Sequence, residues 1–542
     1  MNQYKKELSA FLHSRVFMVC VILVTALSFG FAMTNVTISI DDLEGERYTG
    51  SGNDMLRAGR FGTFLWTRLT GAWDHAFLID ALSLAMMIFA VINWCILFRR
   101  VTDHAVSMEA CTVFSCVFVS YPLMNEVWEY TGTNRIICGG YLLLSIALLL
   151  VYEQIHEGQW KKPWRLILAS LLMMLVCASY ESVVAVYIFF VFAILALQIV
   201  YGTEKEKTLW EVLRQGMIYA SVLVAGLILR VVVHQIILAV MDLEAKTNGA
   251  TKILWGTMPA GQILKNLALD WIRDYVFKGI IYFPLTELCV AAVVLLVIGV
   301  FACKKHGLVL LVPGAGMFLS LVILSLIQGE VSPYRTCQVF AAFVAFVAML
   351  VANWACGRGG KLRVGVLVLC GWLCFQQASC LNYFLTMNHV RSEEEAYVIR
   401  DIGTDLESSF DMSKPVIFIG GYTLSDSTLE AVAVDEDSTA WKLYQNVYAF
   451  TYQMMGEEYD VSQLSRELPQ SNVNSVIQWG THAYRQQGMQ NLFAYYGFDY
   501  VLADVVAIRD EANAYAQSIG MPAYPKDGYI QDAGEYIIIR IE

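Results

Sequence analysis

Eleven apolar runs follow one another along the first 385 residues of this 542-residue chain. A helix that crosses the hydrocarbon core of a bilayer needs about 20 mostly apolar residues. Because unpaired backbone N–H and C=O groups are costly in lipid, such runs must form helices there. They predict an α-helical polytopic membrane protein with about 11 transmembrane helices, at 16–33, 75–98, 106–123, 136–152, 165–179, 182–201, 212–238, 284–303, 308–327, 337–355 and 364–385.

The distribution of charge divides the chain into two parts. Only 16% of the residues are charged, whereas a soluble protein carries about 25%. The chain from Val390 to its end holds 9 basic and 24 acidic residues, a net charge of −15, and since the whole chain carries −11, the preceding part carries +4. We therefore expect a transmembrane domain over 1–388 and an acidic domain over 389–542. Neither part has the basic surface that binds nucleic acid, so we expect no nucleic-acid partner.

The short connections between the runs predict the orientation, because cytoplasmic connections are rich in Lys and Arg. With a cytoplasmic N-terminus, every inner connection is basic and the outer connections, 34–74, 124–135, 179–182, 239–283 and 328–336, hold acidic, aromatic and Gly-rich residues. We expect a multi-pass protein of the cell (plasma) membrane with an extracytoplasmic C-terminal domain. The inner basic residues are Lys5, Lys6, Arg99, Arg100, Lys161, Lys162, Arg165, Lys205, Lys207, Arg214, Lys304, Lys305, Arg358, Lys361 and Arg363.

Two outer connections have amphipathic patterns, over 55–69 and 262–278, which are typical of helices that lie in the membrane interface. The acidic domain has the pattern of an α/β fold. Strands are predicted at 414–421, 475–480, 500–505 and 535–541, and a helix at 506–519.

Two adjacent carboxylates, Asp41 and Asp42, follow the first run in the outer loop 34–74. Neighbouring carboxylates repel each other, so the pair is expected to bind a cation or a proton, or to serve in catalysis. Arg57 and Arg60 follow and supply the opposite charge. The alternative for the two aspartates is a solvated turn or a helix cap.

Further charged and polar side chains recur at the outer ends of the runs. Ionisable groups at the mouth of membrane helices are costly and usually face a cavity of the bundle. Each of them is either a substrate contact or part of a structural ion pair, and His234 is expected to be structural rather than a metal ligand. These residues are Glu126, Glu181, Arg230, Tyr334 and Arg335.

Four short motifs resemble segments of a known family. ISIDDL at 38–43, AGRFG at 58–62, YPLMNE at 121–126 and SYE at 179–181 are similar to outer segments of the bacterial O-antigen glucosyl transferase type II family. The resemblance implies a GT-C-like bundle with a cavity at the outer leaflet. It also implies a polyprenyl-phosphate sugar donor, with glucose as the sugar, and a hydroxyl of a surface glycan as the acceptor.

The chemistry of the residues agrees with glycosyl transfer. A carboxylate must take the proton of the acceptor hydroxyl, which assigns Asp41 or Asp42 as the base without choosing between them. Guanidinium groups match phosphate oxygens, so Arg60 and Arg335 are expected to hold the lipid phosphate. Arg57, Glu126, Glu181, Arg230 and Tyr334 complete the expected substrate site. A divalent cation, Mg²⁺ or Mn²⁺, held by Asp41 and Asp42 is an open alternative.

Two other classes of membrane protein share some of these features. A transporter or flippase of lipid-linked sugars would also need a cavity lined by arginine, but Gly/Pro-broken midplane helices and internal duplication are not evident in the sequence. A ligase or polymerase of surface polymers would differ only in the size of the donor. In the acidic domain, Trp441, Tyr452, Trp479 and Tyr495 are either core residues or sugar-stacking faces.

Overall fold

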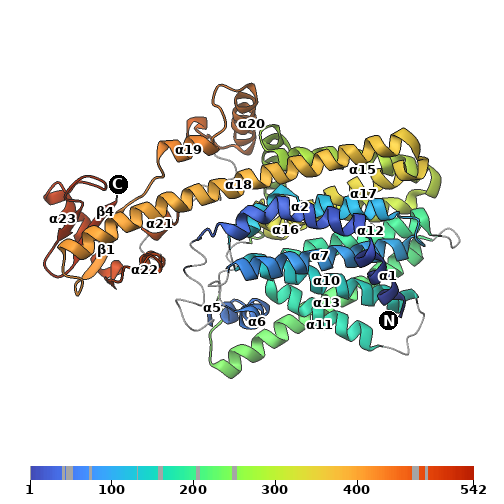
Figure 1. Ribbon diagram of the computed structural model, residues 1–542, viewed down its shortest axis with the longest axis horizontal. Coiled ribbons are helices and arrows are strands. Elements are labelled where there is room, and N and C mark those ends of the chain that lie inside the picture. Colours follow the sequence, from blue (N-terminus) through green and yellow to red (C-terminus); the bar gives the residue numbers. More distant parts are fainter. Residues whose placement is uncertain are drawn as a thin grey trace.

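A bundle of long apolar helices makes up most of the molecule, and one helix continues out of it to carry a small sheet (Figure 1). The computed structural model describes residues 2–39, 43, 53–71, 76–130, 132–156, 163–202, 208–246, 253–466, 475–481 and 486–541. Asp41 and Asp42 lie outside these residues.

Nine helices in the described residues are long and apolar enough to cross a membrane. A tenth span results when α8 and the turn at 122–128 count as one helix bent by 44°. These helices coincide with the predicted runs and confirm the polytopic α-helical class. The nine are α2 Arg15–Thr34, α7 Ala76–Val101, α10 Thr133–His156, α12 Val183–Tyr201, α13 Leu209–Met241, α15 Phe283–His306, α16 Leu311–Gln328 with η6 Leu308–Leu310, α17 Val339–Arg358 and α18 Gly360–Ser409. The bent pair is α8 Met108–Val119 with η2 Pro122–Met124 and α9 Asn125–Trp128.

The remaining predicted run, at 165–179, forms α11 Trp164–Ser179, which has 16 residues. It is about 24 Å long, shorter than the ~30 Å hydrocarbon core of a bilayer. A short helix, α6 Phe61–Thr70, packs against it, and Thr63 Oγ1 donates a hydrogen bond of 2.8 Å to the Ser179 carbonyl at the end of α11. The end of α11 is therefore covered by protein.

The core of the bundle lies among α7, α8, α10, α12 and α17, whose side chains are mostly buried. The ring of Trp94 stacks on that of Phe190 with 4.3 Å between centroids. By contrast, α13 and α15 expose many large apolar side chains. Such faces suit contact with lipid, as a membrane-embedded bundle requires.

Both predicted amphipathic segments are helical. The first consists of two helices, α5 Asn53–Arg57 and α6, because the chain turns at Gly59 with φ of 72°. The second is α14 Ala260–Trp271, which continues through a π-helical turn, η4 Ile272–Phe277, into η5 Lys278–Ile280. Their position relative to a membrane interface stays a prediction.

α18 has 50 residues, about 75 Å of helix. The expected division at 388/389 falls inside it and stays a prediction. The chain after α18 forms a four-stranded sheet in the order β2-β1-β4-β3, with β3 antiparallel and the other pairs parallel. The strands are β1 Pro415–Gly420, β2 Val501–Leu502, β3 Ile530–Asp532 and β4 Ile537–Ile541. The helices are α19 Asp426–Val432, α20 Thr439–Met455, η8 Val461–Gln463, α21 Val476–Gly480, α22 Gln486–Tyr495 and α23 Val505–Ser518.

The prediction of a strand at 475–480 is wrong, because these residues form α21. Its start is held by Glu395 of α18, which accepts hydrogen bonds from Ser475 Oγ at 2.7 Å and from the Ile477 N–H at 3.1 Å. A carboxylate at the first turn satisfies N–H groups that a helix leaves free. The strands at 414–421, 500–505 and 535–541 and the helix at 506–519 are confirmed, although the strand at 500–505 has only two residues, Val501–Leu502.

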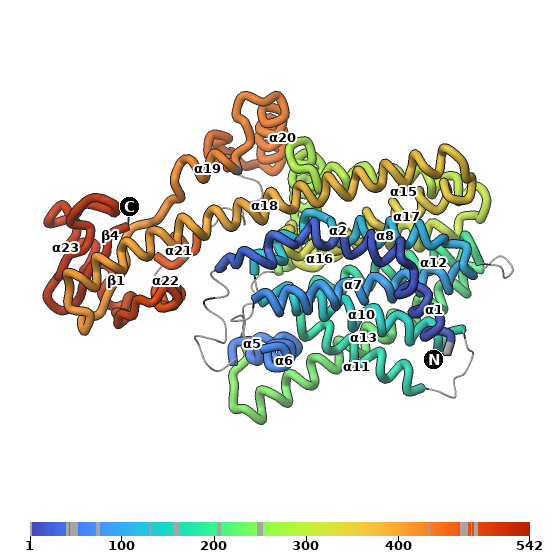
Figure 2. Tube along the Cα trace, viewed as in Figure 1, coloured from blue at the N-terminus to red at the C-terminus, as the bar shows by residue number. Residues whose placement is uncertain are grey.

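Between the bundle and the sheet, α20 lies against the second amphipathic segment (Figure 2). Arg273 of η4 pairs with Asp270 and Asp274 at 2.7 Å, and its guanidinium lies 4.6 Å from the ring centroid of Tyr448 and 5.0 Å from that of Tyr452. This cation–π contact joins the chain after α18 to the bundle.

Candidate active site

Figure 1 shows α5 and α6, which belong to the first predicted outer connection, at the end of the bundle from which α18 continues towards the sheet. Arg230 lies within α13, and the other described members of the predicted site lie at helix ends, in short helices or in turns. Two clusters form, one on α5, α6 and α13 and the other around η7 Tyr334–Thr336.

The first cluster is built on an ion pair. The Arg230 guanidinium of α13 lies 2.5 Å from the Glu181 carboxylate in the turn between α11 and α12. Arg230 Nε also donates a hydrogen bond of 3.4 Å to the Gly59 carbonyl, which fixes the turn between α5 and α6. The His234 imidazole packs on Gly59 at the same place, where an added Cβ would lie 3.1 Å from Nδ1.

The two predicted arginines of α5 and of the turn after it are placed differently. Arg60 is exposed, and its guanidinium lies 5.9 Å from the ring centroid of Tyr180. Arg57 donates a hydrogen bond of 3.0 Å from Nε to the Glu244 carbonyl and lies 3.8 Å from Asp54. Arg57 is thus engaged on the segment after α13.

The second cluster is also linked to the turn at 180–182. Arg335 Nη1 donates to the Tyr130 hydroxyl at 3.2 Å. The carbonyl of Arg335 accepts from Gln338, whose Oε1 accepts from Ser182 Oγ at 2.6 Å. Arg60 and Arg335 are therefore both connected to the turn at 180–182, Arg60 through the Tyr180 ring and Arg335 through its backbone carbonyl, Gln338 and Ser182.

Tyr334 lies beneath a lysine that the sequence analysis did not select. Lys278 Nζ is 5.3 Å from the Tyr334 ring centroid, and the Tyr334 hydroxyl donates to the Asp274 carbonyl at 3.1 Å. Burial lowers the pKa of Lys278, against the opposing effect of the Asp274 and Glu126 carboxylates. Glu126, in α9, is buried. Glu126, Tyr334 and Lys278 therefore belong to one polar cluster.

Beside this cluster lies a buried charge network that the sequence analysis missed. Arg391 of α18 is 1% exposed and lies 3.4 Å from Glu129 and 3.6 Å from Glu395. Its Nη2 also donates to the Ile38 carbonyl at 3.1 Å. Sequence position could not reveal this network, because Glu129 and Ile38 are each more than 250 residues from Arg391.

Contacts from α18 and α22 hold the residues on both sides of Asp41 and Asp42. Ile38 is anchored by Arg391, and the Leu43 carbonyl accepts a hydrogen bond of 2.7 Å from Asn491 of α22. The side chains of Ile38 and Leu43 are buried in a core shared with Val398 and other residues of α18 and the sheet. Both flanks of the aspartate pair are thus held by the chain beyond residue 388.

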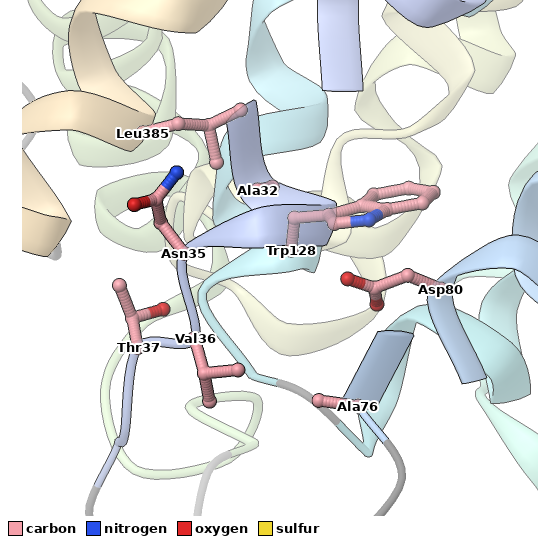
Figure 3. A pocket seen from close by; sticks show the side chains of 8 residues that line it. All are labelled: Ala32, Asn35, Val36, Thr37, Ala76, Asp80, Trp128 and Leu385. Atoms are coloured by element: carbon pink, nitrogen blue, oxygen red, sulfur yellow. The ribbon is translucent and has the colours of Figure 1, made fainter. Parts of the chain in front are cut away.

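Asp80 of α7 is a second site missed from the sequence. It is buried and accepts a hydrogen bond of 2.5 Å from Asn134, and the adjacent Arg135 donates to the Gly71 carbonyl at 2.5 Å. Asp80 faces a small cavity with Trp128 and Asn35 (Figure 3). The sequence alone could have indicated this residue, since Asp80 is an acid inside an apolar run.

The sequence also predicted a possible metal site and possible sugar-stacking aromatic residues. Within the described ranges, no group of three or more His, Cys, Asp or Glu side chains could hold a metal ion, and the predicted metal pair lies outside these ranges. Trp441 is buried, whereas Tyr495 is exposed and Tyr452 contacts Arg273. The side chain of Trp479 lies outside the described part.

The sequence matches the family described as glucosyl transferase GtrII over residues 30–352. This match covers more than half of the 542 residues and contains both arginine clusters. The chain belongs to the glucosyl transferase GtrII family. No curated protein and no solved structure matches the chain.

Membership of the GtrII family confirms the resemblance found in the four motifs and makes the chain a membrane glycosyltransferase. The matched range extends past the last of these motifs to α17. It ends before α18, so Arg391 and Asn491 lie outside the part that the GtrII family defines.

Proposed function

We propose that this chain transfers glucose from a polyprenyl-phosphate donor to a hydroxyl of a surface glycan at the outer face of the plasma membrane, in a GT-C-like arrangement. The observation that supports the proposal is that both arginines are connected to the turn at 180–182: Arg60 lies on Tyr180, and the Arg335 backbone is linked through Gln338 to Ser182. Two guanidinium groups at one mouth of a helix bundle suit a phosphate carried by a lipid.

The reaction forms a bond between the acceptor oxygen and the anomeric carbon, and breaks the bond between that carbon and the phosphate oxygen. Asp41 or Asp42 takes the proton of the acceptor hydroxyl. The electron pair of the broken bond leaves on the polyprenyl phosphate, and the arginines stabilise the negative charge that develops there.

The remaining predicted residues divide between substrate contact and support. Glu181 and Arg230 neutralise each other and hold the Gly59 turn, so we assign them the positioning of Arg60. Lys278 and Tyr334 lie beside Glu126 on the other side. The amine of Lys278 gains its proton more readily when a phosphate is near, since opposite charge raises the pKa of a lysine.

The proposal is tested by sugar transfer from glucosyl phosphoryl polyprenol with the full-length protein in membranes. Asp41→Asn or Asp42→Asn should lower kcat by roughly 100-fold or more, because general-base catalysis contributes about that much. Retention of full kcat by both variants would remove the assignment of the base.

The phosphate role is tested separately by the binding of the donor. Arg60→Ala and Arg335→Ala should each weaken donor binding by about 10-fold, the value of a lost charge-assisted hydrogen bond. Arg68→Ala is the matched control, because Arg68 is on α6 and its guanidinium faces the Phe64 ring at 5.2 Å. Donor affinity that is unchanged in both site variants would contradict the proposal.

A further inference from the structure

The cavity beside Asp80 is lined by both polar and apolar residues. Asp80, Asn35 and Thr37 supply carboxylate, amide and hydroxyl groups (Figure 3). The remaining lining residues are Trp128, Ala32, Val36, Ala76 and Leu385. Water alone would favour a fully polar lining, whereas this cavity suits a group with a short apolar part and a polar end.

The cavity holds about one water-sized group, so a whole sugar ring does not enter it. On a hexopyranose, the hydroxymethyl group is the hydroxyl-bearing group that projects from the ring by an extra carbon. Its hydroxyl oxygen has the size of one water and matches the polar lining groups, while its CH₂ remains at the edge of the cavity.

The hydrogen-bonding groups of the cavity also match a hydroxyl, which both donates and accepts. The indole N–H of Trp128, a residue that is 4% exposed, has no hydrogen-bond partner among the residues that the structure describes. A buried donor without a partner carries a free-energy cost that a ligand oxygen would remove. Asp80 already accepts from Asn134, but a carboxylate has about four lone-pair sites and can accept from a ligand hydroxyl as well.

We propose that this cavity receives the hydroxyl of the hydroxymethyl group of a hexose during glucosyl transfer, with Trp128 donating to its oxygen and Asp80 accepting from it. The inference rests on the proposed function and assigns its sugar specificity. The hexose is either the glucosyl group of the donor or the acceptor sugar. Thr37 of the lining precedes Asp41 by four residues, a chain length of at most about 14 Å, so the cavity lies within reach of the proposed base.

The test compares three donors with the full-length protein: polyprenyl phosphate carrying glucose, 6-deoxyglucose or xylose. The last two lack the hydroxyl and the whole hydroxymethyl group, respectively. If the donor sugar occupies the cavity, kcat/KM should fall by about 30-fold or more with both, because buried polar groups are left unpaired. Asp80→Asn and Trp128→Phe should reduce this preference to less than about 10-fold.

Ser83→Ala is the matched control, because Ser83 lies one turn further along α7 and contacts Asn134 but does not line the cavity. It should keep the preference of the unmodified protein. If the acceptor sugar occupies the cavity instead, Asp80→Asn should raise the acceptor KM by about 10-fold and leave the donor preference unchanged. Equal use of the three donors together with an unchanged acceptor KM would overturn the inference.

Failure of the proposed function has a different result, namely no transfer from any donor. The cavity is then tested by the binding of glucosyl and 6-deoxyglucosyl phosphoryl polyprenol to the protein. Weaker binding of the deoxy compound, lost in Asp80→Asn, would support the inference, and equal affinities would overturn it.

Discussion

At the scale of single residues, Arg391 joins three parts of the chain that are distant in sequence. Its guanidinium contacts Glu129 of the bundle, Glu395 on its own helix and the carbonyl of Ile38. A buried guanidinium is tolerated only when carboxylates and carbonyls replace its water. These contacts place the first residue of the ISIDDL motif against α18.

Arg391→Met should destabilise the fold by ~3–5 kcal/mol, because it leaves Glu129 and Glu395 buried without their cation. The measurement is reversible unfolding in mixed micelles. Arg400→Met is the control on the same helix, since Arg400 is exposed and contacts only the Tyr496 ring among the interactions described for it. That variant should lose less than ~1 kcal/mol. Equal losses in the two variants would show that the network has no special role.

At the scale of elements, the close contact between α6 and α11 determines where Arg60 lies. Gly62 is buried at this contact, and a Cβ added there would lie 2.4 Å from Ser179 Oγ and 2.7 Å from the Leu175 carbonyl. A backbone carbonyl cannot rotate away as a side chain can. A side chain at position 62 must therefore move α6.

Gly62→Ala should destabilise the protein by ~1–3 kcal/mol and weaken donor binding, because α6 shifts and displaces Arg60. The matched control is Gly261→Ala in α14, where nothing lies within 4 Å of an added Cβ. That variant should be neutral or more stable by up to ~1 kcal/mol, since alanine favours helix. Thermal unfolding and donor titration check both. Unchanged donor affinity in Gly62→Ala would show that donor binding by Arg60 does not depend on the position of α6.

At the scale of the whole molecule, the chain after α18 is connected to the candidate active site. Asn491 and Leu43 are 448 residues apart, yet the Asn491 amide donates to the Leu43 carbonyl, and Leu43 is fully buried. Arg273 and the tyrosines of α20 form a second connection. The sheet and its helices therefore support the loop that contains Asp41 and Asp42.

Asn491→Ala should lower kcat for glucosyl transfer by about 10-fold and leave donor affinity unchanged, because one anchor of the aspartate stretch is lost while the arginines remain. Asn513→Ala on α23 is the control, since the Asn513 side chain donates only to the Arg509 carbonyl within its own helix among its described contacts. Donor titration and single-turnover transfer distinguish the two effects. A kcat equal to that of the control would limit this part of the chain to a structural role.

The periodic and compositional features of the chain were sufficient to predict its class. Apolar runs form helices in lipid whatever their neighbours are, so the spans could be placed from hydropathy alone. The strands at 415–420 and 537–541 were equally evident, since buried strands are short apolar runs. The structure of the segment at 475–480 was not evident, because a short apolar run is compatible with either a strand or a helix. The Glu395 carboxylate at the start of this segment stabilises the helix.

The members of the candidate site could be selected only in part. Glu181, Arg230 and Arg335 stood out because charges at the ends of apolar runs are rare. Asp80 was an equally strong signal that went unused, whereas Lys278 and Arg391 lie in polar stretches where charge is ordinary.

The sequence by itself determined that this protein is a membrane-embedded helical bundle of the glucosyl transferase type, because hydropathy and short motifs are local properties. The tertiary structure decided which charges meet: Arg230 with Glu181, Arg391 with Glu129, and Asn491 with the Leu43 backbone. Such pairs depend on how helices pack, and packing brings together residues whose separation along the chain carries no information about their contact.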